Sequence, residues 1–205
     1  MPPQTSARHE PAHPVQTIHK LQDLDAIFHD ETDAVIWERP TPPSVLSALN
    51  NLPTHQITNG RFCVPASAVG RCVADTFNAW GFDAEDARRW LIADIETLAR
   101  HMARILSSSN LLIRIEVVRD DACRKFHRDT VKARLICTYN GPGTEFGVSN
   151  GNGCADDIKN APTGGPILLK GKLWPGSPSQ TVLHRSPPIA GADTSRLVIV
   201  LNEAC

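Results

Sequence analysis

Two histidines and one aspartate are the side chains of this chain whose types and spacing best suit chemistry. His127 and Asp129 stand two positions apart in FHRD, residues 126–129. Side chains alternate between the faces of a β-strand, so a His-x-Asp pair on a strand presents both groups to one face. His184, in LHRSPP at 183–188, could complete the set from a later strand. Two imidazoles and one carboxylate cap one face of a metal ion and leave open positions, which suits non-haem Fe(II) oxygen chemistry.

The distribution of histidine supports this interpretation. The chain has 8 His, and all except these two lie at or before His101. The alternative is that both are ordinary polar residues at strand ends. Cys123 precedes His127 by four positions and would bring a thiol close to the pair, but we interpret it as a packing or incidental residue.

The elements that must position these residues are β-strands. From residue 110 onward, apolar and β-branched runs separated by Gly, Pro, Asn and Ser predict a succession of strands. The Gly- and Asn-rich stretch 147–165 is predicted to be a loop that could border a substrate entrance. The predicted strands cover residues 111–118, 133–140, 166–176, 181–189 and 195–202.

The N-terminal part has a different pattern. Residues 1–16 lack periodicity and predict a disordered tail. The main element is a helix over 83–107, with Asp83 as a possible cap and an apolar stripe at helical spacing. Shorter elements are a helix at 21–28, a strand at 34–40 and a helix at 44–53 with Ser44 as a possible cap. The stripe of the main helix is formed by Leu91, Ile95, Leu98, Met102 and Ile105.

Helices followed by strands predict an α+β fold, mainly β, with the helices on one side of an antiparallel sheet system. We expect a single compact domain, in which residues 17–109 form a helical support region and residues 110–205 form the β core.

Four segments give the chain a family resemblance: FHxD, CTYxGPGTE, KGxLWPG and LHRSPP. In these the sequence resembles a bacterial family, domain of unknown function 1826, whose genes accompany zinc-homeostasis genes. More distantly, residues 110–202 resemble the Fe(II)/2-oxoglutarate-dependent dioxygenases, especially the prolyl-hydroxylase-like branch. The order of His-x-Asp, a Tyr-bearing strand, Thr-x-Phe, Lys-Gly and Leu-His carries that resemblance. It implies a double-stranded β-helix (jelly-roll) core.

The resemblance also implies a set of roles. Fe(II) would be held by His127, Asp129 and His184. Arg196, about a dozen positions after His184, would grip the distal carboxylate of 2-oxoglutarate, and the Tyr139 hydroxyl could add a hydrogen bond. The alternatives are a surface arginine that opens a strand and a core tyrosine. Arg134 and Arg185 flank the site in the sequence. Either could meet an anionic substrate or be a plain surface charge, and we favour the surface interpretation.

Three functions remain open. The first hypothesis is an Fe(II)/2-oxoglutarate-dependent oxygenase of hydroxylase type with an unknown substrate. The second is a non-oxygenase metal-binding protein that holds Zn²⁺ at the same His/Asp/His site and is linked to zinc homeostasis. The third is a cupin-like binding or isomerase domain without oxoglutarate.

Composition and charge argue against some classes of binding partner. The net charge of −1 provides no field that would recruit nucleic acid or an anionic membrane, and the longest apolar run near the C-terminus, residues 197–201, is too short to span a bilayer. The N-terminus has no apolar stretch typical of a secretory signal. The 6 Cys form no Cys-x-x-Cys pair. We therefore expect a cytoplasmic protein with reduced thiols.

Overall fold

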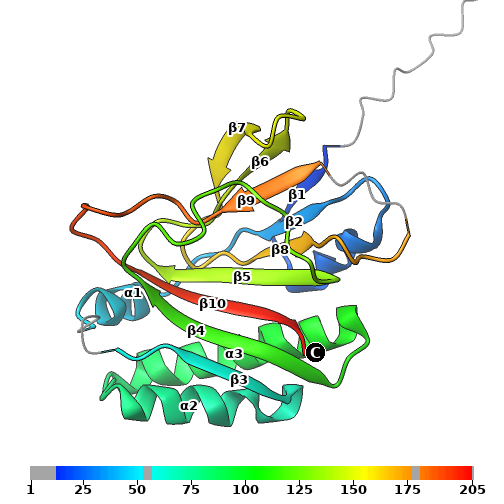
Figure 1. Cartoon of the computed structure of the whole chain (residues 1–205). Helices are drawn as coiled ribbons and strands as arrows, with labels where there is room; N and C mark the ends of the chain where they lie inside the picture. Colours follow the sequence, from blue (N-terminus) through cyan, green and yellow to red (C-terminus); the bar gives the residue numbers. More distant parts are fainter. Residues whose placement is uncertain (1–12, 53–56, 177–180, 205) are drawn as a thin grey trace, which may run out of the picture.

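The computed structural model describes residues 13–52, 57–176 and 181–204. Two β-sheets and a group of helices make up this part of the chain, and most of the helical residues lie against one face of the larger sheet (Figure 1). The mixture of helices and largely antiparallel sheets agrees with the predicted α+β class.

The larger sheet has seven strands in the order β1-β2-β8-β5-β10-β4-β3. Only β1 and β2 pair in parallel, and the other neighbours are antiparallel. The predicted strands of the C-terminal half are all present, although two are shorter than expected because Gly and Pro end their pairing early. The bounds are β1 Val15–Ile18, β2 Ala34–Trp37, β3 Gly60–Pro65, β4 Asn110–Val118, β5 Ala133–Asn140, β8 Ile167–Lys170 and β10 Arg196–Glu203.

The smaller sheet has three antiparallel strands in the order β7-β6-β9, with β6 at Glu145–Ser149, β7 at Ala155–Asn160 and β9 at Val182–Arg185. The prediction of a loop over 147–165 is therefore wrong, because a hairpin occupies much of that stretch. Five of the six residues of β7 are exposed. Such a strand carries no apolar alternation, which is the feature that identifies strands in a sequence.

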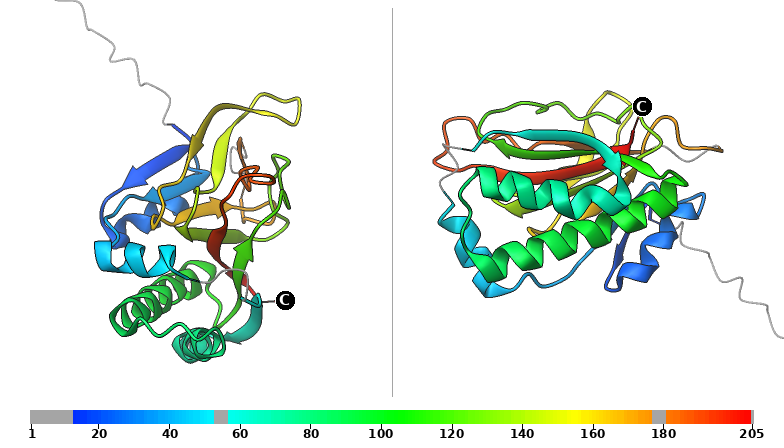
Figure 2. Two further views of the ribbon diagram at one scale, coloured as in Figure 1. Left: turned by 90° about the vertical axis from the view of Figure 1, so that its left-hand side faces the viewer. Right: turned by 90° about the horizontal axis from the view of Figure 1, so that it is seen from below.

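The helices are α1 (Pro43–Asn50), α2 (Val69–Ala79) and α3 (Glu85–Leu106), with short 3₁₀ turns at Leu21–Phe28 and Ala66–Ala68. Seen from below, α2 and α3 lie side by side under the larger sheet (Figure 2). The predicted stripe of α3 is buried throughout, as the helical spacing indicated. Its expected cap is not used: α3 starts after Ala84, without a side-chain cap, and α1 likewise starts after Pro42.

The N-terminal region is more than a helical support. Its strands β1, β2 and β3 occupy both edges of the seven-stranded sheet, so the β core does not begin at residue 110. Most of the predicted tail, residues 1–16, lies outside the described residues. Its end differs from the prediction, since Val15 and Gln16 pair with Ala34 and Val35.

Two apolar cores result from this layering. One lies between the helices and the larger sheet, and the other lies between the two sheets. Alternate residues of β5 and β10 contribute to each core, so these strands connect the two layers. Among the described residues, no helix is long and apolar enough to cross a membrane.

Candidate functional site

The His-x-Asp segment lies beside strand β9, in the connection between β4 and β5. It is not part of a regular strand, contrary to the prediction, but His127 and His184 form an isolated antiparallel bridge. Each donates its backbone N–H to the carbonyl oxygen of the other, at 3.0 Å in both directions. This reciprocal pair fixes the two imidazoles side by side, with ring centroids 4.6 Å apart.

The side chain between the two predicted ligands points the other way. Arg128 is buried, donates to the Val182 carbonyl oxygen at 3.1 Å and lies 3.8 Å from the Asp33 carboxylate. Neighbouring side chains of an extended segment point to opposite sides. Since the contacts of Arg128 hold its side chain beneath β9, His127 and Asp129 both point toward the space between the sheets.

The structure brings the three predicted ligands together. Potential ligand atoms of His127, Asp129 and His184 all lie within 4.8 Å of one another. The Nε2 atom of His184 is 3.1 Å from Asp129 Oδ2, and the Nε2 atom of His127 is 3.6 Å from Asp129 Oδ1. A carboxylate oxygen and two imidazole nitrogens that converge in this way can coordinate one face of a cation.

The pKa shifts of His184 and Asp129 favour metal binding, whereas that of His127 opposes it. His127 Nδ1 lies 2.8 Å from the Lys125 carbonyl oxygen, so donation at Nδ1 leaves the Nε2 lone pair free. Burial lowers the pKa of His184, which keeps its imidazole neutral. Burial opposes ionisation of Asp129, but hydrogen bonds with both histidines and the charge of Arg134 outweigh it and hold its pKa well below the usual range. The hydrogen bond with Asp129 raises the pKa of His127.

A divalent metal fits one oxygen of Asp129 in particular. Arg134 donates a hydrogen bond to Oδ1. The other oxygen, Oδ2, is buried and faces the Nε2 atom of His184, 3.1 Å away. A cation bound between this carboxylate oxygen and a neutral imidazole nitrogen would replace the hydrogen bond between them.

Arg196 lies in the same pocket as the two histidines. Its guanidinium donates to four neutral oxygens: the Pro142 carbonyl at 2.7 Å, Ser186 Oγ at 2.5 Å, Thr138 Oγ1 at 3.1 Å and Thr144 Oγ1 at 3.2 Å. Its exposed fraction is 3%, and no described carboxylate forms an ion pair with it. Glu145, whose charge acts on Arg196, forms its ion pair with Arg185 instead. Burial lowers the pKa of Arg196 to about 10, although the charge of Glu145 opposes the shift.

The Gly-Pro-Gly turn after β5 brings two of these acceptors to Arg196. Gly141 has φ +80°, and a Cβ there would lie 2.3 Å from the Ser195 carbonyl oxygen. A Cβ on Gly143 would lie 1.7 Å from the Ala161 carbonyl oxygen. Only glycine permits both the left-handed backbone and this close approach, which places Pro142 and Thr144 against the guanidinium.

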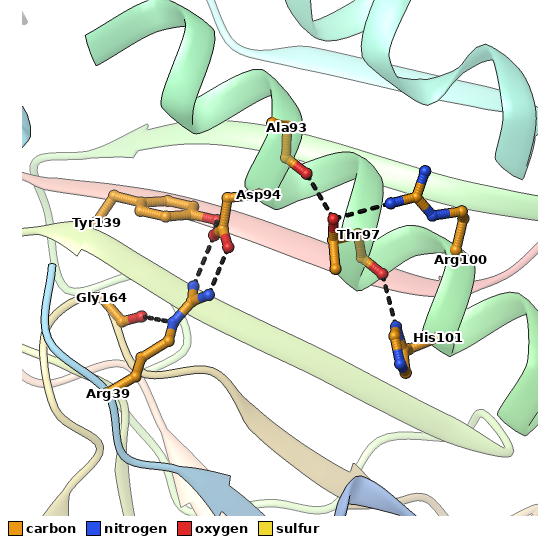
Figure 3. A network of polar contacts seen from close by, with 8 residues as sticks. All are labelled: Arg39, Ala93, Asp94, Thr97, Arg100, His101, Tyr139 and Gly164. Atoms are coloured by element: carbon orange, nitrogen blue, oxygen red, sulfur yellow. Dashed lines mark hydrogen bonds and ion pairs between the residues drawn. The ribbon is translucent and has the colours of Figure 1, made fainter. Parts of the chain in front are cut away.

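The structure does not bring Tyr139 to the pocket. Its side chain is fully buried on the helix-facing side of β5, and its hydroxyl donates to Asp94 Oδ2 at 2.5 Å (Figure 3). Thr138, one residue earlier, faces the pocket and accepts from Arg196. The expected contact of Tyr139 with a cofactor therefore does not fit the strand, whose alternate residues face opposite layers.

Arg134 is a functional candidate that the sequence analysis interpreted as a surface charge. Its side chain is 18% exposed, lines the pocket and bonds to Asp129, so it is not a surface charge. Arg134 and Thr138 both occupy even-numbered positions of β5, so their side chains face the same side of the strand. This shared face is the signal in the sequence that places Arg134 on the side of the pocket. Arg185 also lines the pocket, paired with Glu145 at 2.6 Å, and Cys123 lines its rim.

Comparison with solved structures places the fold among dioxygenases. Dioxygenase for auxin oxidation 1 from Arabidopsis thaliana, solved as a complex with 2-oxoglutarate, superposes with a TM-score of 0.51 at 12% identity, over 93% of this chain and 91% of that one. The rice dioxygenase for auxin oxidation gives a TM-score of 0.49 at 15% identity, over 93% and 82%. No curated protein matches the sequence significantly.

The family follows from the sequence itself. The model of the family described as protein of unknown function DUF1826 matches residues 19–202, which include every strand and helix from the first 3₁₀ turn to β10. The chain therefore belongs to the DUF1826 family, and its fold is similar to that of a dioxygenase solved as a complex with 2-oxoglutarate.

Proposed function

We propose that this protein is an Fe(II)/2-oxoglutarate-dependent oxygenase that hydroxylates a C–H bond of its substrate. One observation carries the proposal: a His/Asp/His cluster and a buried arginine without a carboxylate partner line one pocket between two sheets. In this proposal the two sheets are the two halves of a double-stranded β-helix, with the larger sheet extended by strands from the N-terminal region.

His127 Nε2, His184 Nε2 and Asp129 Oδ2 would hold Fe(II). Bound Fe(II) supplies the O₂ chemistry that couples decarboxylation of 2-oxoglutarate, to succinate and CO₂, with hydroxylation of the substrate. The protein prepares for this by keeping His184 neutral and Asp129 ionised. Arg134 holds the second carboxylate oxygen, which leaves Asp129 to bind through one atom.

Arg196 would bind the distal carboxylate of 2-oxoglutarate. Its side chain is already oriented by Pro142, Ser186 and the two threonines, so binding costs little additional ordering. A bidentate guanidinium–carboxylate contact would supply the negative charge that the buried arginine lacks. The apolar floor of the pocket excludes water and strengthens this contact.

The test separates metal binding from oxoglutarate binding. Protein purified without oxygen is loaded with Fe(II), and 2-oxoglutarate binding is followed by calorimetry, by visible absorption and by release of succinate when O₂ is admitted. We expect His184→Ala to lose Fe(II), and Arg196→Met to retain Fe(II) while losing 2-oxoglutarate. A wild-type protein that retains Zn²⁺ tightly but binds no 2-oxoglutarate with any metal would overturn the oxygenase and favour a zinc-binding role.

A further inference from the structure

Two further arginines, Arg114 and Arg134, line the pocket. They lie on a part of the larger sheet that is away from Arg196. Arg114 is on β4 and Arg134 is on β5, and both point into the space between the sheets. Strand β10 runs between them: Arg114 pairs with Val200, and Arg134 pairs with Asn202. Arg196 begins the same strand, four residues before Val200, which corresponds to roughly 13 Å of extended chain.

This region holds unused hydrogen-bonding capacity. The Nε atoms of Arg114 and Arg134 and the Oδ1 atom of Asn202 are buried and have no hydrogen-bond partner among the described residues. Buried donors without partners are rare in folded proteins and destabilise them. Two guanidinium groups in one place also repel each other.

Existing acids only partly compensate these cations. Glu116 lies 3.4 Å from Arg114, with both side chains 27% exposed, and Asp129 accepts from Arg134. Neither contact uses more than part of a guanidinium, which has five N–H donors. An additional acceptor can therefore bind both arginines without breaking either pair.

We propose that Arg114 and Arg134 bind a carboxylate of the primary substrate, which is a small monocarboxylate with an aliphatic chain. The proposal rests on the proposed oxygenase function and names its substrate class. The chain would lie on Ile136, Val198 and Val200, which form the apolar floor of the pocket. Because Arg134 also contacts Asp129, the carbon atoms next to the carboxylate would lie closest to the metal ligands.

Charge favours a single negative group over a phosphate. Three arginines and a divalent metal bring five positive charges to this space, whereas Glu116, Asp129 and dianionic 2-oxoglutarate bring four negative charges. Arg185 and Glu145 cancel each other. One further negative charge restores balance, and the second charge of a phosphate would stand unpaired near Glu116.

The test uses three probes with the same six-carbon chain: hexanoate, 1-hexanol and hexylamine. Each is titrated calorimetrically, without oxygen, into the full-length protein loaded with Fe(II) and 2-oxoglutarate. We expect hexanoate to bind at least about tenfold more tightly than either analogue, because only it can accept from two guanidinium groups. Equal binding of hexanoate and hexanol would overturn the proposal.

Variants locate the binding site. Arg114→Gln should weaken hexanoate binding by about tenfold or more, and Arg114→Lys should retain part of it, since the charge remains. The matched control is Arg61→Gln: Arg61 is the exposed β3 neighbour of Arg114 and does not line the pocket. Unchanged hexanoate binding by a folded Arg114→Gln protein, or loss of binding only in Arg196→Met, would overturn the assignment.

The two proposals can fail separately. Hexanoate binding that depends on Arg114, in a protein that releases no succinate from 2-oxoglutarate, would reject the oxygenase while leaving a carboxylate site. Succinate release with hexanoate binding that is independent of Arg114 would retain the oxygenase and reject the substrate class.

Discussion

Two buried arginines on opposite sides of strand β5 have contrasting surroundings. Arg39 lies on the helix side, where its guanidinium binds both oxygens of Asp94 (Figure 3). The guanidinium also stacks over Trp37, at 4.2 Å from the ring centroid. Its Nε donates to the Gly164 carbonyl oxygen at 2.8 Å. Burial opposes its charge, but the hydrogen bonds and charge of Asp94 outweigh it and raise the pKa of Arg39.

Arg196 lies on the pocket side and has only neutral acceptors. Its pKa falls to about 10, because burial penalises its charge by more than the charge of Glu145 compensates. The difference shows how the same residue serves two purposes. A buried cation that has its anion built in holds the fold together, whereas a buried cation without one is ready for an anion from solution.

The two arginines are also connected. The carbonyl oxygen of Gly164 accepts from Arg39, and the N–H of Gly164 donates to the Thr138 carbonyl oxygen at 2.7 Å. Thr138 in turn accepts from Arg196 through its hydroxyl. The Arg39–Asp94 ion pair therefore stabilises strand β5, which orients the side chain of Arg196.

The largest effect is expected from breaking the structural pair. Asp94→Ala would leave the buried charge of Arg39 uncompensated, which typically costs about 3–5 kcal/mol. The free energy of unfolding from urea titration measures this. The double variant Arg39→Met with Asp94→Leu should recover much of the loss, since it removes both charges. A loss below about 1 kcal/mol in Asp94→Ala would contradict the structural role.

Arg196→Met should give the opposite result. We expect the free energy of unfolding to change by no more than about 1 kcal/mol, because the variant also removes an uncompensated buried charge. The affinity for 2-oxoglutarate should fall by roughly 2–4 kcal/mol, the scale for losing one partner of a partly buried charge pair. Added 2-oxoglutarate at 100 times its Kd should stabilise the wild type by about 2.7 kcal/mol and should leave this variant unchanged.

Arg134→Gln tests the group that holds Asp129. Removing the donor to Oδ1 should weaken Fe(II) binding by about 10–100-fold, as expected for partners of metal ligands. Competition with a chelator measures this without requiring turnover. Arg185→Gln is the matched control, since Arg185 lines the same pocket but pairs with Glu145. Equal losses in both variants would indicate a general effect of pocket charge.

Tyr139→Phe should have the smallest effect and should act only on the structural side. Loss of the hydroxyl removes one hydrogen bond to the carboxylate of Asp94, which Arg39 still binds through both oxygens, so the free energy of unfolding should fall by about 0.5–1.5 kcal/mol. The affinity for 2-oxoglutarate should not change, because the side chain faces the helices. A weaker affinity for 2-oxoglutarate would restore Tyr139 as a cofactor contact and undermine the contrast between the two sides of β5.

The sequence predicted the long, regular elements well. The stripe of α3 has helical spacing, and β4 alternates between buried and half-buried residues along its length, so the pattern itself specifies the element. The hairpin of β6 and β7 could not be found in this way. Its residues are mostly Gly, Asn and charged groups, and pairing with β9 makes it a sheet.

The candidate site shows the same division between what the sequence predicted and what only the tertiary structure decided. Residue types and motif order in the sequence nominated His127, Asp129, His184 and Arg196, because few combinations of side chains suit a metal and a carboxylate ligand. Tertiary structure alone decided which neighbours face them: it turned Tyr139 to the helices and aimed Arg134 at Asp129. A strand's two faces are equivalent in sequence when both are buried, and β5 is buried on both, so only the layers packed against it distinguish them.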